Sequence, residues 1–288
     1  MRLGVSLSST HPSDGPRIMI ERARTAHEAG FTSLSIGDHH NMPVPYAQST
    51  PMLGRLLAEW PGRPAGCLFL VPLWHPVLMA EHIGTLAATH DATFIVQTGI
   101  GHGDSQFRAF GASMSTRGRV LEETISTVKA LLAGETVDNG YLGLVGGRVG
   151  LLPPEPVEWW IGGGVEVAIE RAARMGDAWY AAPGLSAEDG AKLVELHRAA
   201  GGTRAILRKD ALVLADGDEA RRLATELVEA GYRGLGLDVL LVGDPDDAAA
   251  QLEAYAEAGF DEVIVRTMTV PQELALETLA SLGPLGDR

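Results

Sequence analysis

A carboxylate followed by two adjacent histidines is the group of side chains in this sequence best suited to proton transfer. Asp38, His39 and His40 follow Leu34–Ile36, a short segment that reads as a β-strand, after a single glycine. An imidazole titrates near neutral pH, and a neighbouring carboxylate orients it or raises its pKa when the two side chains meet. In a parallel α/β fold the carboxyl ends of the strands surround the open concave face. We therefore predict an acid–base site at Asp38 and His39.

Polar residues also follow the next two expected strands. His75 comes after the third strand, and His102, within a Gly-His-Gly sequence, after the fourth. Neighbouring strand ends of a parallel barrel meet around one pocket, so we expect His102 to join His39 there. His75 directly precedes a proline at the expected start of a helix, and we interpret it as structural.

Neither a metal centre nor a disulfide is expected. Histidine and aspartate can ligate zinc or iron, but adjacent residues of an extended segment point in opposite directions. His39 and His40 are therefore poorly placed to bind one ion together. Cys67 is the single cysteine and lies in an apolar stretch, which excludes an internal disulfide and indicates a core position.

Three glycines between an expected strand and an expected helix form the second chemical signal. Gly162, Gly163 and Gly164 follow Trp-Ile and lead through Val165 into Glu166. Such a turn presents backbone N–H groups at a helix N-terminus and lets an anion approach closely, which suits a phosphate. The lysine and hydroxyl of a Walker loop are absent, and the spacing is not that of GxGxxG. A plain strand-to-helix turn remains the alternative.

The elements that must position these residues alternate between strand-like and helix-like patterns. Expected strands cover residues 2–7, 33–36, 65–71, 93–99, 157–161, 178–181, 208–215 and 261–266. Expected helices cover 16–29, 51–60, 76–88, 115–133, 165–175, 187–200, 218–231, 245–258 and 271–282. Alternation of this kind demands a parallel sheet covered by helices. We predict an α/β fold, a (β/α)8 TIM-like barrel, as a single domain over residues 1–288.

Two irregular segments interrupt the alternation. Residues 40–64 separate the second and third strands, and residues 134–156 are rich in glycine and proline. Long connections in a compact domain are usually functional or mobile. We expect both to lie over the catalytic face, with 134–156 as an irregular insertion there.

Composition limits the partners. The net charge of −14 and a pI near 5.0 argue against nucleic acid and anionic membrane surfaces. The N-terminus lacks a signal-peptide pattern, and no apolar run approaches the roughly 20 residues of a membrane span. We expect a cytoplasmic metabolic protein. Lysine occurs only at 129, 192 and 209, which argues against an aldolase-type barrel.

Motifs along most of the chain resemble the bacterial luciferase-like flavin-dependent oxidoreductases. The resemblance rests on the order and spacing of the residues at 26–31, 37–40, 70–76, 98–103, 106–111, 160–164, 171–173, 176–179 and 242–245, together with Arg117 and Glu122. It implies a luciferase-like barrel that binds FMN or the deazaflavin coenzyme F-420 at its carboxyl-terminal face. It also implies a homodimer.

The resemblance places the cofactor. Its phosphate would lie at Gly162, Gly163, Gly164 and Val165, and its ring near the third and fourth strands, with Gly101 close by. In the family a backbone distortion at the end of the third strand supports the ring. The corresponding residues here are Leu68, Phe69 and Leu70.

Three functions follow as hypotheses. The first is a two-component monooxygenase that uses reduced FMN from a separate flavin reductase, with O2 and a small organic substrate. His39 would be its acid or base, and His102 would contact flavin or substrate. The second is hydride transfer with F-420, which Asp38 favours because the monooxygenase branch typically has glutamate there. The third is a flavin-binding protein without turnover. Trp60, Trp74, Phe107 and the 134–156 segment are expected to shape an apolar substrate pocket.

Overall fold

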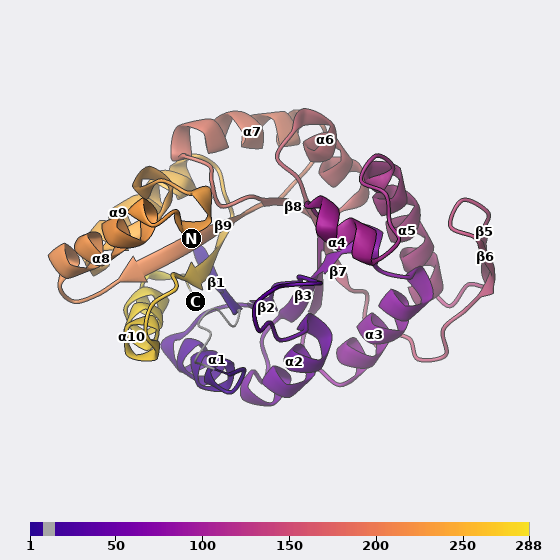
Figure 1. Cartoon of the computed structure of the whole chain (residues 1–288), viewed down its shortest axis with the longest axis horizontal. Coiled ribbons are helices and arrows are strands. Elements are labelled where there is room, and N and C mark those ends of the chain that lie inside the picture. The colour runs from indigo at the N-terminus through magenta and orange to yellow at the C-terminus, as the bar shows by residue number, and fades with distance from the viewer. Residues whose placement is uncertain (8–14, 288) are drawn as a thin grey trace.

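The computed structural model describes residues 1–7 and 15–287, and its strands form a closed parallel barrel wrapped by helices (Figure 1). Within the described residues the ring consists, in order, of β1 (Arg2–Leu7), β2 (Leu34–Ile36), β3 (Ala65–Leu70), β4 (Phe94–Gly99), β7 (Glu158–Gly162), β8 (Ala178–Ala181), β9 (Ala205–Val213) and β11 (Glu262–Thr267). The parallel pairings β1–β11 and β8–β9 close the ring. The predicted (β/α)8 architecture is confirmed.

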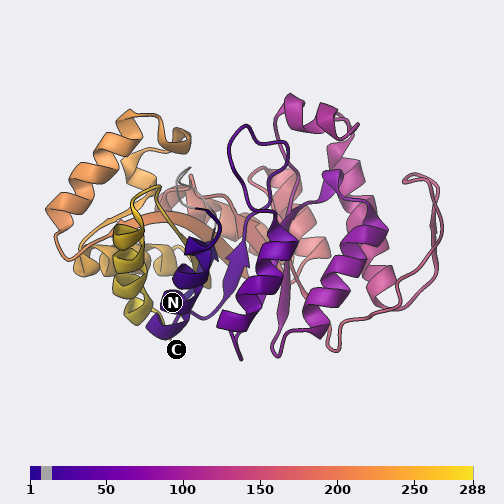
Figure 2. The same ribbon diagram turned by 60° about the horizontal axis from the view of Figure 1, so that its bottom comes forward.

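Helices cover the outside of the ring (Figures 1 and 2). The α-helices are α1 (Ile18–Ala29), α2 (Ser49–Leu56), α3 (Pro76–Ala88), α4 (Asp104–Ala109), α5 (Arg117–Leu132), α6 (Glu166–Met175), α7 (Ala187–Ala199), α8 (Gly217–Glu229), α9 (Pro245–Glu257) and α10 (Gln272–Leu282). Short 3-10 turns are η1 (Leu57–Glu59), η2 (Val71–Leu73), η3 (Tyr232–Gly234), η4 (Leu237–Val239) and η5 (Gly283–Leu285). In the described part of the chain, no helix is both long and apolar enough to cross a membrane.

Strand residues alternate between the helix layer and the barrel interior, as a barrel requires. Cys67 and Val96 are fully buried in the cluster that packs under the helices, whereas Ile95, Trp160 and Ile206 form an interior layer. The core position predicted for Cys67 is confirmed, and burial raises the pKa of its thiol.

Two elements near the barrel rim were not anticipated from the sequence. One is α4, and the other is β10 (Leu241–Gly243), which lies outside the ring on the edge of β9. The first half of β9 pairs with β8, where Leu207 is opposite Ala181. Its last residues pair with β10, where Ala211 is opposite Leu241. The end of β9 nearest the mouth thus pairs with β10 instead of β8.

The 134–156 segment lies beside the barrel, so the expectation that it covers the catalytic face is wrong (Figures 1 and 2). It holds a hairpin of β5 (Val137–Asn139) and β6 (Leu144–Gly147). Asn139 donates to Thr127 Oγ1 of α5 at 2.9 Å, and the Arg119 guanidinium lies 4.0 Å from the centre of the Tyr141 ring. The reason is topological. The segment leads from the end of a helix to the start of a strand, and such connections begin and end at the amino-terminal side of the barrel.

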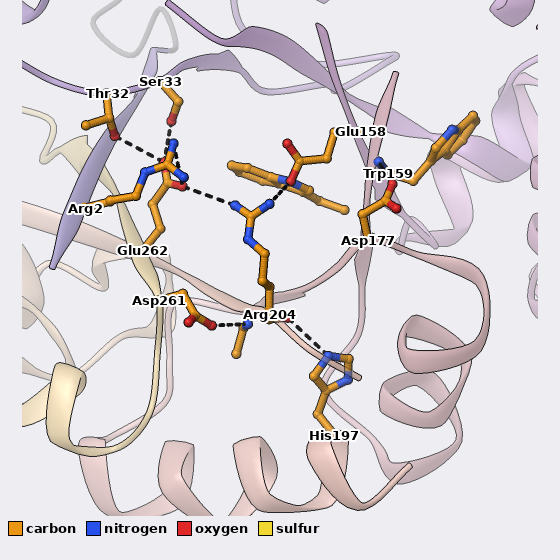
Figure 3. A network of polar contacts seen from close by, with 12 residues as sticks. Arg2, Thr32, Ser33, Glu158, Trp159, Asp177, His197, Arg204, Asp261 and Glu262 are labelled. Atoms are coloured by element: carbon orange, nitrogen blue, oxygen red, sulfur yellow. Dashed lines mark hydrogen bonds and ion pairs between the residues drawn. The ribbon is translucent and has the colours of Figure 1, made fainter. Parts of the chain in front are cut away.

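Charged side chains close that amino-terminal end, and Arg204 lies between two of them (Figure 3). Arg204 pairs with Glu158 and lies 3.8 Å from Glu262. Glu262 is fully buried, accepts from Ser33 Oγ at 2.6 Å and lies 3.8 Å from Arg2. Burial raises the pKa of the Glu262 carboxyl despite these favourable contacts. The buried charges at this end are thus paired with one another.

Candidate active site

A small cavity opens among the carboxyl ends of β1, β2, β9 and β11, with a volume of about 220 Å³. It is lined by Ser6, Gly37, Asp38, His39, Met42, Val44, Tyr46, Leu68, Arg208, Arg233, Arg266 and Thr269. This is the end of the barrel where the sequence placed the site, and both Asp38 and His39 border the cavity.

Asp38 is hydrogen-bonded to the neighbouring strand and lies close to His40 instead of His39. Its fully buried carboxylate accepts from the Leu70 amide at 2.8 Å and from Trp74 Nε1 at 2.9 Å, both through Oδ2. Its other oxygen lies 3.2 Å from His40 Nε2. The side chains of His39 and His40 diverge, as expected for adjacent residues of an extended segment. The role foreseen for Asp38, orienting His39, is therefore replaced by that of a positioning residue that joins the ends of β2 and β3.

His39 is half-buried beside the cavity. Its ring packs edge-on against Tyr46, with ring centres 5.6 Å apart. Burial lowers the pKa of His39, Asp38 opposes this effect, and His102, Arg266 and Arg208 lower the pKa further. His39 is consequently neutral at physiological pH and can accept a proton.

His102 meets His39 as the strand-end argument predicted. The two ring centres are 6.4 Å apart, although His102 is exposed on the loop after β4. Gly101 just before it has a φ of 71°, a left-handed conformation that favours glycine, and its carbonyl accepts from Arg117 at 3.1 Å. The geometry leaves His102 free to contact a ligand at the mouth.

Gln106 was missed as a site residue, although it belongs to one of the family-like motifs. It lies on α4 and accepts from the His40 amide at 2.8 Å while donating to the His102 carbonyl at 3.2 Å. Gln106 thus fixes the loop after β2 against the loop after β4. The motif includes Gln106, but the helix α4 that carries it was not predicted from the sequence.

Three arginines are the larger omission. Arg208 on β9, Arg266 on β11 and Arg233 on η3 all border the cavity. A signal was present in the sequence, because Ile206, Arg208 and Asp210 occupy alternate positions and so share one face of β9. That face is the barrel interior, where charged residues need a reason to be retained.

Packing explains two of the three glycines in the turn after β7. A Cβ on Gly162 would lie 2.3 Å from the Thr98 carbonyl oxygen, and a Cβ on Gly163 would lie 2.4 Å from the Ala168 Cβ. Gly164 has open space around its Cβ direction. Val165, 64% exposed, caps α6 with its backbone and leaves the turn accessible from solvent. Only the outer part of the turn is thus available to an anion.

The three residues at the end of β3 differ in whether they face the mouth of the barrel. Leu68 borders the cavity, and the Leu70 backbone leaves the extended conformation, with φ −77° and ψ 75°. Phe69 is fully buried on the opposite face, with its ring 5.0 Å from that of Trp74. Alternation turns the Phe69 side chain toward the helices, so only its backbone lies at this end of the strand, and the expected support of the ring by residues 68–70 stays a prediction.

The aromatic residues expected to shape the pocket are mostly packing residues. Trp60 is fully buried in the outer core and donates to the Pro64 carbonyl. Phe107 is buried against Leu70. Trp74 contacts the site through its hydrogen bond to Asp38.

No lysine of the described chain borders the mouth cavity. Lys209 is fully buried on the helix-facing side of β9, and its ammonium donates to the carbonyls of Pro183 and Val239, each at 3.0 Å, and of Leu185. Burial lowers the pKa of Lys209 to about 7. Its three acceptors match the three donors of an ammonium, so it tethers loops instead of serving the mouth.

The interior beside β3 and β4 fits the ring of a flavin or deazaflavin. The Gln97 amide nitrogen is buried and has no hydrogen-bond partner within the described residues. Gly99 lies two residues further on the same face of β4 and has no side chain that could cover the Gln97 amide. Leu68 and Leu70 belong to the adjacent apolar cluster. An apolar shelf with an unpaired donor suits a ring whose edge carries carbonyl groups.

Known proteins resemble this chain over nearly its whole length. The family model described as luciferase-like monooxygenase matches residues 1–228. An F420-dependent glucose-6-phosphate dehydrogenase of Amycolatopsis mediterranei (strain U-32) is 22% identical over 98% of this chain and 100% of its own.

Solved structures share the fold. The oxygenating constituent of 3,6-diketocamphane monooxygenase from Pseudomonas putida, in complex with FMN, superposes with a TM-score of 0.83 at 16% identity, over 99% of this chain and 98% of its own. An F420-dependent secondary alcohol dehydrogenase gives a TM-score of 0.80 at 17% identity, over 100% and 99%.

Proposed function

Since this chain belongs to the luciferase-like monooxygenase family, we propose that it is a deazaflavin (coenzyme F-420)-dependent oxidoreductase that oxidises a hydroxyl group of a small substrate. The observation that carries the proposal is His39, a neutral imidazole that borders a cavity with three guanidinium groups. A cavity so rich in charge suits hydride transfer to or from a polar substrate. A monooxygenase that protects an oxygen adduct of flavin needs instead a pocket from which water is excluded.

The residues have distinct tasks in this proposal. Leu68, Leu70 and Gln97 would hold the cofactor ring, and the outer turn at Gly164 and Val165 its phosphate. When bound, the cofactor supplies the acceptor for a hydride.

His39 removes the hydroxyl proton of the substrate as the carbinol C–H bond breaks and the carbonyl forms. The proton therefore remains on the imidazole, from which it passes to solvent. Asp38 and His40 keep the β2 end in place, so that His39 faces the cavity.

A two-component FMN monooxygenase with a separate flavin reductase is the second candidate. It is favoured by the apolar side chains of Met42, Val44 and Leu68, which border the same cavity. The FMN-bound neighbour in the comparison shares the fold, and the curated relative acts with F420. We therefore rank F-420 first.

Cofactor titration separates the candidates. We expect oxidised F-420 to bind at least tenfold more tightly than FMN in either redox state, and to be reduced when a panel of small alcohols and hydroxy acids is added. Tighter binding of reduced FMN, with oxygen-dependent product formation, would favour the monooxygenase instead. Failure of every flavin and deazaflavin to bind would contradict both.

A further inference from the structure

The arginine triad, Arg208, Arg233 and Arg266, gathers positive charge at one wall of the mouth. Arg208 lies on β9, Arg266 on β11 and Arg233 on η3, and all three border the cavity beside His39. The whole chain has only 23 lysines and arginines and a net charge of −14. The three guanidiniums around this cavity of about 220 Å³ thus concentrate positive charge on a protein whose net charge is negative.

Carboxylates in the structure do not balance the triad. Asp210, fully buried, lies 3.2 Å from Arg233 Nε and 3.9 Å from Arg208 Nε, and also accepts from the Tyr232 hydroxyl at 2.8 Å. Arg266 has no ion pair with any described residue, and its buried Nε, like that of Arg208, has no hydrogen-bond partner there. Buried donors of this kind normally find an acceptor.

Asp38, the other carboxylate at the cavity, is already engaged. It accepts from the Leu70 amide and Trp74 Nε1 and lies 3.2 Å from His40 Nε2. Asp38 forms no ion pair with the three arginines among the described contacts. The described carboxylates thus leave the Nε groups of Arg208 and Arg266 without a hydrogen-bond acceptor.

The backbone at Arg233 adds an independent observation. Arg233 has a φ of 50°, in the left-handed region that non-glycine residues rarely adopt. Gly231 and Gly234 on either side also have positive φ. The chain accepts this strain where a guanidinium is delivered to the cavity, and retained strain of this kind clusters at ligand sites.

The triad is separate from the cofactor residues proposed above. The glycine turn follows β7, whereas β9 and β11 are the seventh and eighth strands of the ring. The Leu68–Gln97 shelf belongs to β3 and β4. Loops after the seventh and eighth strands frequently bind phosphate groups in barrels of this class.

We infer that the arginine triad is a subsite for the anionic group, carboxylate or phosphate, of the substrate whose hydroxyl His39 deprotonates. This inference rests on the proposed function for the role of His39, but the anion site itself does not require the cofactor. Guanidiniums recognise both kinds of anion through paired N–H donors. Arg266, which has no ion pair among the described residues, is the residue with most to gain from binding.

Inorganic phosphate and malonate are the probes, titrated separately into the cofactor-free protein by calorimetry at constant ionic strength. We expect the wild type to bind at least one of them and Arg266→Gln to weaken that binding at least tenfold. The matched control Arg222→Gln removes one exposed charge on α8 and should change the affinity less than twofold. Preference for phosphate identifies a phosphate ester as the substrate class, and preference for malonate a carboxylate.

Two further readouts separate a binding site from a structural charge cluster. Anion binding should raise the pKa of His39, because the bound negative charge offsets the guanidiniums. NMR of the His39 ring protons measures this pKa. Arg266→Gln should melt at the wild-type temperature or above it in anion-free buffer, since no described carboxylate loses a partner.

Equal affinity of wild type and Arg266→Gln for both probes, or a marked loss of melting temperature, would overturn the inference. So would a loss of F-420 affinity in Arg266→Gln as large as the loss of anion affinity, because the triad would then hold the cofactor. Failure of the wild type to bind F-420 or FMN, with anion binding intact, would refute the proposed function alone.

Discussion

At the scale of single residues, the contacts of Asp38 and His40 explain why His39 is the proposed acid–base group. The Asp38 carboxylate is hydrogen-bonded to the end of β3 and lies 3.2 Å from His40 Nε2, whereas His39, which also borders the cavity, has no hydrogen bond to Asp38 among the described residues. Burial and the nearby guanidiniums keep its imidazole neutral. The pKa of His39 is therefore lowered chiefly by burial, and the nearby Asp38 carboxylate offsets only part of that effect.

Removal of this imidazole should abolish proton transfer while sparing cofactor binding. We expect His39→Gln to lower turnover by about 10²–10⁴-fold, the usual contribution of a general base. Because the pKa of His39 is lowered from 6.5, kcat/KM for alcohol oxidation should fall with decreasing pH only below 6.5. This acid limb should be missing in His39→Gln.

His75→Gln is the matched control, since His75 is exposed at the start of α3 and its side chain makes no capping hydrogen bond. It should retain wild-type turnover and the same pH profile. An acid limb that survives in His39→Gln would assign the titration to another group.

The strand-end pattern predicted the meeting of His39 and His102 because register in a parallel barrel fixes which strand ends are adjacent. Which side chain pairs with Asp38 was beyond the sequence, since it depends on where the η2 turn delivers the Trp74 indole. The arginine triad was missed because its members come from segments far apart in the chain. Arg233 in particular lies on a turn that no periodicity marks.

At the scale of elements, the turn between β7 and α6 combines a packing role with a proposed binding role. Gly164→Val places its side chain in open space, at a backbone conformation that any residue adopts. We expect this variant to fold normally but to bind F-420 more weakly, as the side chain obstructs the helix N-terminus. Affinity for the same chromophore without its phosphate should be unchanged, which fluorescence titration can measure.

Gly163→Val is the contrasting variant. Its Cβ would lie 2.4 Å from the Ala168 Cβ, so it should lose stability, seen as a lower melting temperature. Equal losses of affinity for both chromophores in Gly164→Val would count against a phosphate contact at the turn.

Element boundaries show where periodicity succeeds and fails. The ring strands were predictable because long alternating or apolar runs bounded by glycine and proline are typical of buried strands. β10 and α4 have three and six residues, too few to establish a period. The β5–β6 hairpin was mistaken for a lid because length and glycine content do not tell at which end of the barrel a connection lies.

At the scale of the whole molecule, the two ends of the barrel use buried charge differently. The amino-terminal end pairs its carboxylates with arginines, Arg204 and Arg2 facing Glu262. The mouth has an excess of guanidiniums. The closed end thus pairs its buried charges within the protein, and the open end retains charge for a ligand.

The closed end should give the protein a measurable pH dependence of stability. Burial raises the folded-state pKa of Glu262 above 4.5, so the folded state binds more protons than the unfolded state between the two values. Stability from this group is full below pH 4.5 and is lost as the pH rises through the folded-state pKa. Denaturation midpoints of the wild type relative to Glu262→Gln should therefore fall with rising pH across this window.

Glu229→Gln, at the exposed end of α8, is the control and should show a flat difference from the wild type. A wild-type advantage over Glu262→Gln that grows with pH would show that the ion pairs with Arg204 and Arg2 outweigh burial.

The position of the β5–β6 hairpin makes it an attachment point for protein engineering. It packs along the outside of α5, away from the mouth, and its Val145 is 87% exposed. An enzyme that regenerates the cofactor, fused through this hairpin by a short flexible linker, would be held at an effective concentration on the order of millimolar. Redox equivalents would then be supplied within one polypeptide while substrate still reached an unobstructed barrel.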